Sequence, residues 1–69
     1  MMTLSQIRLN AYEAIEHLRN ARAGVGTSDV RENHRTKAGE LLSSLPANWW
    51  RRLPDSESDQ IANQLGLYA

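Results

Sequence analysis

Two histidines and eight Asp and Glu residues are the side chains of this chain that could bind a metal ion or transfer a proton, and there is no cysteine. Glu13 and His17 lie four residues apart, a spacing that places two ligands on one face of a helix. A zinc site uses three or four protein ligands, so one pair is too few. The sequence therefore predicts no metal site and no cofactor.

Motifs of known reaction types are missing from the sequence. It has no nucleophile elbow, no glycine-rich phosphate loop and no HExxH pair. A helical chain of 69 residues also leaves little room for a substrate pocket, which usually takes roughly 300 Å³ or more. We therefore expect that this protein is not an enzyme.

The segment LPANWWRRLP carries both Trp residues of the chain beside two of its Arg residues. On a short helix Trp49 and Leu53 share one face, where we expect them to be buried, and Trp50 points about 100° away. Trp50 then either covers the side of the last helix or forms an exposed patch with Arg51 and Arg52. Trp and Arg are enriched at the centres of protein interfaces, so the second alternative predicts a partner-binding site at these residues. The acidic run DSESD that follows could instead neutralise both arginines.

The same segment is suited to nucleic acid, since Trp can stack on bases and Arg can contact phosphates. A second pointer to DNA is the C-terminal stretch SDQIANQLGLYA, whose I-A-x-x-L-G-L run resembles the first helix of a helix-turn-helix. The resemblance implies a recognition helix that would begin where the chain ends, at Ala69, so we expect an incomplete motif. A small DNA-binding transcriptional regulator is the alternative function.

Arg31, Arg35 and Lys37 lie near the outer side of the second predicted helix, interspersed with Glu32 and Glu40. A solvated face of mixed charge is the ordinary explanation for this pattern. The alternative is a helix that faces DNA or an acidic partner.

His34 lies on the apolar side of the same predicted helix, beside Val30, Ala38 and Leu41. The ordinary expectation is a boundary histidine whose polar edge is hydrogen-bonded. A second hypothesis places His34 at an oligomer interface, where a buried neutral imidazole resists protonation and assembly becomes pH-sensitive.

Leu9 is the large apolar residue opposite the apolar stripe of the first predicted helix, and Tyr12 lies partway round towards it. A helix that is apolar on more than one side can contact both its own core and a partner. The core of so short a chain without disulfides is small, and oligomerisation is a common remedy. We therefore expect a homodimer that self-associates through Leu9 and Tyr12.

The sequence predicts helices that would carry the candidate residues named above. Thr3 and Gln6 form a capping-box pattern that opens a helix over about 3–23, in which apolar residues recur at 3–4 spacing. Asp29 with Glu32, or Ser28 as a rival cap, opens a second helix over about 29–44.

The C-terminal third of the chain predicts two shorter helices. Pro46 suits the first turn of a helix over about 46–52, which Pro54 ends. Ser56 opens a last helix over about 56–65, and Gly66 ends it so that Leu67 folds back in a Schellman motif. No strand-like alternation occurs. The sequence therefore predicts one all-α domain over residues 1–69, in which an antiparallel helical hairpin carries a short Trp-containing helix and a C-terminal helix.

The net charge, the length of the apolar segments and the absence of cysteine narrow the classes of function that we expect for the protein. The net charge is zero, far below the basicity of a dedicated nucleic-acid binder, although all eight Lys and Arg lie in residues 1–53. No segment approaches the roughly 18 apolar residues that span a bilayer. The N-terminus lacks a signal pattern, and the absence of cysteine suits the cytoplasm. We therefore expect a small cytoplasmic regulatory, adaptor or inhibitor protein that binds another protein and no membrane, as many bacterial and phage accessory proteins do.

Overall fold

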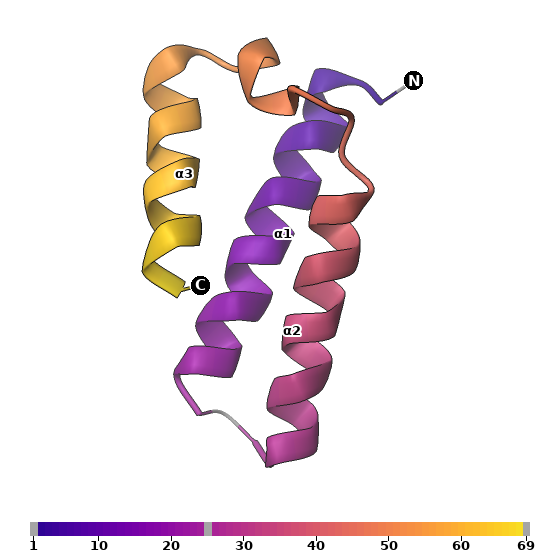
Figure 1. Cartoon of the computed structure of the whole chain (residues 1–69), viewed down its shortest axis with the longest axis vertical. Coiled ribbons are helices and arrows are strands. Elements are labelled where there is room, and N and C mark those ends of the chain that lie inside the picture. The colour runs from indigo at the N-terminus through magenta and orange to yellow at the C-terminus, as the bar shows by residue number, and fades with distance from the viewer. Residues whose placement is uncertain (1, 25, 69) are drawn as a thin grey trace.

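The computed structural model describes residues 2–24 and 26–68 and shows an all-α fold, as predicted. Its elements are α1 (Leu4–Arg22), α2 (Ser28–Ser43), the 3-10 turn η1 (Trp49–Arg52) and α3 (Asp55–Tyr68). Helices α1 and α2 form an antiparallel hairpin, and α3 lies on the other side of α1 (Figure 1). Within the described ranges, no helix combines the length and apolarity needed to cross a membrane.

The first helix begins as the sequence predicts. The Thr3 hydroxyl accepts a hydrogen bond from the Gln6 backbone N–H at 3.2 Å, and Gln6 Oε1 accepts one from the Thr3 N–H at 2.9 Å. This reciprocal capping box satisfies two backbone donors that a helix N-terminus otherwise leaves free.

The second helix begins one residue before the predicted start, and its cap is neither Asp29 nor Ser28. Thr27 has an extended backbone, and its hydroxyl accepts a hydrogen bond from the Val30 N–H at 3.4 Å. Gly26, with a φ of 88°, turns the chain so that Thr27 occupies the cap position. Only glycine adopts such a left-handed φ at little cost in free energy. The turn at Gly26 therefore determines where α2 begins.

A short helix over 46–52 was a wrong prediction, because only Trp49–Arg52 forms a turn of 3-10 helix. Asn48 has a left-handed φ of 62°, which no α-helix accepts in its interior. Asn is one of the few residue types that adopt this conformation readily, so it separates the Pro46 turn from η1.

The last helix is longer than predicted at both ends. The Pro54 carbonyl accepts hydrogen bonds from the N–H groups of Glu57 and Ser58 at 3.0 and 2.9 Å, so α3 begins at Asp55 rather than at a Ser56 cap. Gly66 does not end the helix, which continues to Tyr68. Leu65 and Tyr68 pack against the core, and this burial outweighs the roughly 1 kcal/mol that glycine costs inside a helix. Leu67 does not fold back and is 60% exposed.

The core follows the inner side of α1, which is the only helix that packs extensively against both others in the described structure. Ala11 and Ile15 of α1 meet Leu53 and Ile61, and the half-buried Trp49 packs against this cluster. Small residues on the α1–α2 contact side allow close approach of the two helices. The buried apolar residues are Ile7, Ala11, Ala14, Ile15, Ala21, Ala38, Leu45, Leu53 and Ile61.

We predict that Ile61→Ala destabilises the protein by about 2–5 kcal/mol, because Ile61 is fully buried and its truncation leaves a cavity. Leu67→Ala on the same helix is the matched control and should change stability by less than about 0.5 kcal/mol. Urea unfolding followed by circular dichroism measures both. Equal losses for the two variants would contradict the orientation of α3.

Candidate functional site

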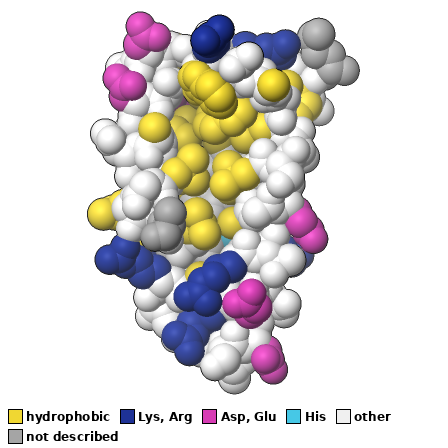
Figure 2. Space-filling view, in the orientation of Figure 1, with side chains coloured by type: hydrophobic (Ala, Val, Ile, Leu, Met, Phe, Trp, Pro, Cys, Tyr) yellow, Lys and Arg dark blue, Asp and Glu magenta, His cyan; other side chains and the backbone are white. Residues whose placement is uncertain are grey.

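An apolar groove lies along the face of α1 that is left uncovered between α2 and α3. Because α2 and α3 lie on opposite sides of α1 and have few contacts with each other, α1 forms the floor between them. Figure 2 shows apolar side chains gathered down the middle of this face, with cationic side chains at its lower end. We call this feature the α2–α3 groove. The structure has one pocket lined by residues of all three helices and another between η1 and α3. The apolar pocket is lined by Trp49, Trp50, Ser58, Asp59, Ala62 and Leu65; the arginine pocket is lined by Leu18, Ala21, Arg22, Arg31, Arg35 and Tyr68.

The apolar pocket has a volume of about 310 Å³ and lies between η1 and α3. Trp49 and Trp50 meet edge to face, with ring centroids 6.0 Å apart and an interplanar angle of 80°. Ala62 and Leu65 extend the apolar surface along α3. Trp50 is 47% exposed, so it both touches the side of α3 and presents part of its ring to solvent.

The two arginines after Trp50 are not neutralised by the acidic start of α3. Both are exposed, and Arg52 donates a hydrogen bond to the Met2 carbonyl at 3.3 Å. Glu57 is instead paired with Arg8 of α1 at 2.8 Å, a contact that ties α3 to the N-terminal half of α1. In the part of the chain that the structure describes, neither Arg51 nor Arg52 forms an ion pair. Arg51 and Arg52 are therefore exposed cations that follow Trp50 in η1 and do not line the apolar pocket.

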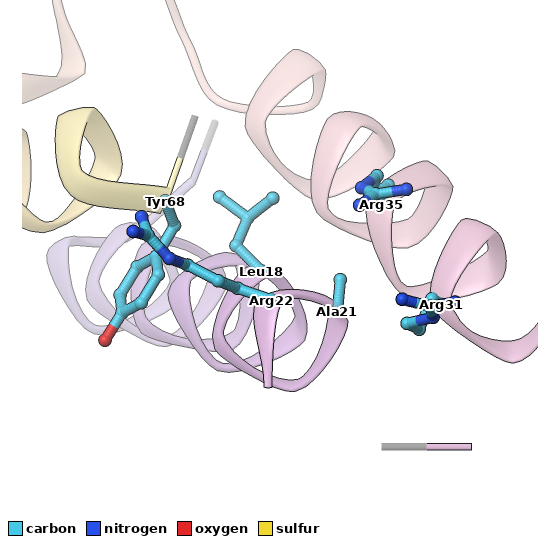
Figure 3. Close-up of a pocket in the computed structure, with 6 residues that line it drawn as sticks. All are labelled: Leu18, Ala21, Arg22, Arg31, Arg35 and Tyr68. Atoms are coloured by element: carbon cyan, nitrogen blue, oxygen red, sulfur yellow. The ribbon is translucent and has the colours of Figure 1, made fainter. Parts of the chain in front are cut away.

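The arginine pocket has a volume of about 340 Å³ and is formed by all three α-helices. Figure 3 shows Arg22 and Tyr68 on one side, Arg31 and Arg35 of α2 on the other, and Leu18 and Ala21 between them.

The groups around the arginine pocket neutralise only part of the positive charge of its three arginines. Arg22 donates a hydrogen bond to the Leu67 carbonyl at the end of α3. Arg31 Nε is buried and has no hydrogen-bond partner among the described residues. Among the described residues, no carboxylate lines the pocket. Within the same ranges, Arg35 contacts Glu32, and their charged atoms are 3.6 Å apart on exposed side chains.

Next to this pocket, Tyr68 also contacts Arg19. The interaction with the Tyr68 side chain, and to a lesser degree with Glu16, raises the pKa of Arg19 above its ordinary value. Arg19 is also paired with Glu16 at 3.3 Å, so Glu16 partly balances its charge beside the C-terminal end of α3.

Sequence reasoning missed the arginine pocket. It expected Arg31, Arg35 and Lys37 on one solvated outer face, but Arg31 is half-buried and lines the groove with Arg35, whereas Lys37 does not. The usable signal was the i, i+4 spacing of Arg31 and Arg35, which places them one turn apart on one side of α2. Nothing in the sequence indicated that Arg22 would join them.

His34 contacts His17 across the α1–α2 hairpin. Their Nδ1 atoms are 2.9 Å apart and their ring centroids 5.1 Å apart. This contact is a hydrogen bond in which one ring donates and the other accepts, so at least one ring is neutral. Glu13, which the sequence pairs with His17, is exposed. The pH sensitivity of His34 stays a prediction.

Leu9 and Tyr12 lie on a different face from Trp50, Arg51 and Arg52. They are 58% and 42% exposed. Nine residues at about 100° each place Leu9 on the opposite side of α1 from Leu18, which lines the groove. The structure therefore does not bring the residues predicted for self-association together with those predicted for partner binding.

We predict that His17 and His34 are energetically coupled by about 0.5–1.5 kcal/mol, the usual net value of a hydrogen bond. A double-mutant cycle of His17→Ala and His34→Ala, measured by urea unfolding, gives this coupling. The matched control is the cycle of Glu13→Ala with His34→Ala, which we expect to be additive. A coupling of zero between the histidines would show that the 2.9 Å contact contributes nothing.

The described residues thus offer an apolar groove with a basic end. They hold no cluster of three or more side chains arranged to bind a metal ion. Comparisons with protein-family models, with curated proteins and with solved structures find no match. The function of the protein must therefore be inferred from the residues that line the groove and the two pockets.

Proposed function

We propose that this protein is a small regulatory, adaptor or inhibitor protein that acts by binding another protein through the α2–α3 groove. The observation that carries the proposal is the apolar pocket, which the chain's own elements leave open beside the half-exposed Trp50. A cytoplasmic location is part of the proposal and depends on the absence of cysteine.

The composition of the apolar pocket is that of a protein-interface centre. Trp50 supplies a large apolar ring, and Leu65 and Ala62 supply the surface against which a partner side chain would pack. Trp and Arg dominate the binding energy of many interfaces when they are surrounded by a rim that excludes water. Arg51 is exposed and forms no ion pair among the described residues, and we propose that it contributes to such a rim.

A DNA-binding regulator is the second candidate, and one observation favours it. Arg22, Arg31 and Arg35 line one pocket from two helices, which the sequence did not indicate. Such a site could contact a phosphate of the DNA backbone. The protein-binding proposal is preferred because the larger part of the groove is apolar, whereas interfaces with DNA are polar and strongly basic.

We predict that Trp50→Ser reduces partner capture from a lysate of the native host at least about tenfold, because it removes a central ring from the interface. Affinity capture with mass spectrometry measures the enrichment of each protein. Leu67→Ser, at an exposed apolar residue that lines neither pocket, is the matched control and should leave capture unchanged. Circular dichroism must show that both variants are folded. Capture that Trp50→Ser leaves intact would contradict the groove as the binding surface.

The homodimer is a separate part of the proposal, and it assigns self-association to Leu9 and Tyr12. We predict that light scattering on a size-exclusion column returns twice the chain mass of 7.8 kDa at micromolar concentrations. Leu9→Arg should convert the dimer to a monomer, because an isologous contact places the added charge against its own copy. A mass of 7.8 kDa for the wild type would contradict the dimer.

A further inference from the structure

The arginine pocket concentrates positive charge in a recess. Three guanidinium groups line it without a carboxylate among the lining residues. The contact of Arg35 with Glu32 does not cancel this charge, since exposed pairs at such distances contribute little. An anion that enters the pocket would therefore meet cations whose charge is not already compensated by the protein.

The donors also remain available for a ligand. Arg31 Nε is buried without a hydrogen-bond partner among the described residues, a situation that normally costs stability unless a ligand or water satisfies the group. Arg22 uses one of its N–H groups on the Leu67 carbonyl, which fixes its position and leaves the others free.

The two guanidinium groups on α2 suit a phosphate. Arg31 and Arg35 lie one turn apart on one side of the pocket, whereas Arg22 lies across the pocket and its side chain extends towards Tyr68 (Figure 3). Arginine pairs with phosphate oxygens through two parallel hydrogen bonds, and a phosphate has enough oxygens to serve several guanidinium groups.

The remaining lining is apolar. Leu18 and Ala21 lie between the arginines, and Tyr68 closes the side at the end of α3 (Figure 3). A pocket of about 340 Å³ is large enough for a phosphate together with a small organic group, as small-molecule sites begin at roughly 300 Å³. An organic group held next to the phosphate would therefore be partly desolvated by Leu18 and Tyr68.

We infer that the arginine pocket is a binding site for a small phosphate monoester with an apolar or aromatic substituent. A monoester carries close to two negative charges at neutral pH, which matches the positive charge of the arginine pocket better than the single charge of a carboxylate or of a phosphodiester. This site goes beyond the proposed protein-binding activity, because it uses the arginine pocket and not the apolar pocket.

Isothermal titration calorimetry at low ionic strength tests the inference with four probes: phenyl phosphate, inorganic phosphate, benzoate and a short DNA duplex. We expect phenyl phosphate to bind about tenfold more tightly than benzoate, because a doubly charged phosphate has enough oxygens to pair with both Arg31 and Arg35. It should also bind more tightly than inorganic phosphate, because its ring contacts the apolar lining.

Substitutions separate the pocket from general charge attraction. Arg35→Gln and Arg31→Gln should each weaken phenyl phosphate binding about tenfold or more, the loss expected for one charge-assisted contact. Arg51→Gln removes the same charge outside the pocket and is the matched control, with an expected change of less than about twofold. Arg35 is exposed, so Arg35→Gln tests the site even if Arg31→Gln perturbs folding.

Three results would overturn the inference. The first is the absence of phenyl phosphate binding to the folded wild-type protein. The second is an equal loss in Arg51→Gln and Arg35→Gln, which would show non-specific attraction. The third is tighter binding of the duplex than of phenyl phosphate, which would favour the DNA-binding candidate.

Discussion

Burial along one side of α1 is the constraint on which the rest of the structure depends. Only α1 packs extensively against both of the other helices, and its buried positions are mostly Ala and Ile. Alanine lets α2 approach closely, whereas Ile15 reaches the cluster formed with Leu53 and Ile61. A chain of 69 residues has too few large apolar side chains to fill a second layer between α2 and α3. The two outer helices are therefore held by α1 and not by each other, and the groove is the consequence.

The two ends of the groove differ because different segments close them. At one end the left-handed Asn48 places Trp49 inward and leaves Trp50 half-exposed against α3. At the other end α2 begins after the Gly24–Gly26 turn, and its first turns bring Arg31 and Arg35 opposite Arg22. The two pockets therefore differ in chemistry: Trp49, Trp50 and Leu65 make the first largely apolar, whereas three arginines make the second basic.

Local patterns predicted the fold well but predicted the site poorly. The Thr3–Gln6 capping box and the inward side of Trp49 and Leu53 follow from spacing of a few residues, which a sequence displays directly. Gly66 was wrongly predicted to end the last helix, because glycine favours a helix end locally. The packing of Tyr68 against the core is a tertiary effect that outweighs this preference. The His17–His34 contact and the arginine pocket join residues from separate helices. Periodicity identifies which face of a helix is apolar, but not which residue of another helix lies opposite each position.

The C-terminal half of α3 connects the two pockets physically. Ala62 and Leu65 line the apolar pocket, and Tyr68, three residues after Leu65, lines the arginine pocket. Arg22 holds the last turn of α3 through the Leu67 carbonyl, whereas Arg8 holds the first turns through Glu57. The last turns of α3 therefore carry residues of both pockets, and their position depends on the packing of Leu65 and Tyr68 against the core as well as on Arg22. A change in the packing of this one helix would alter the walls of both pockets.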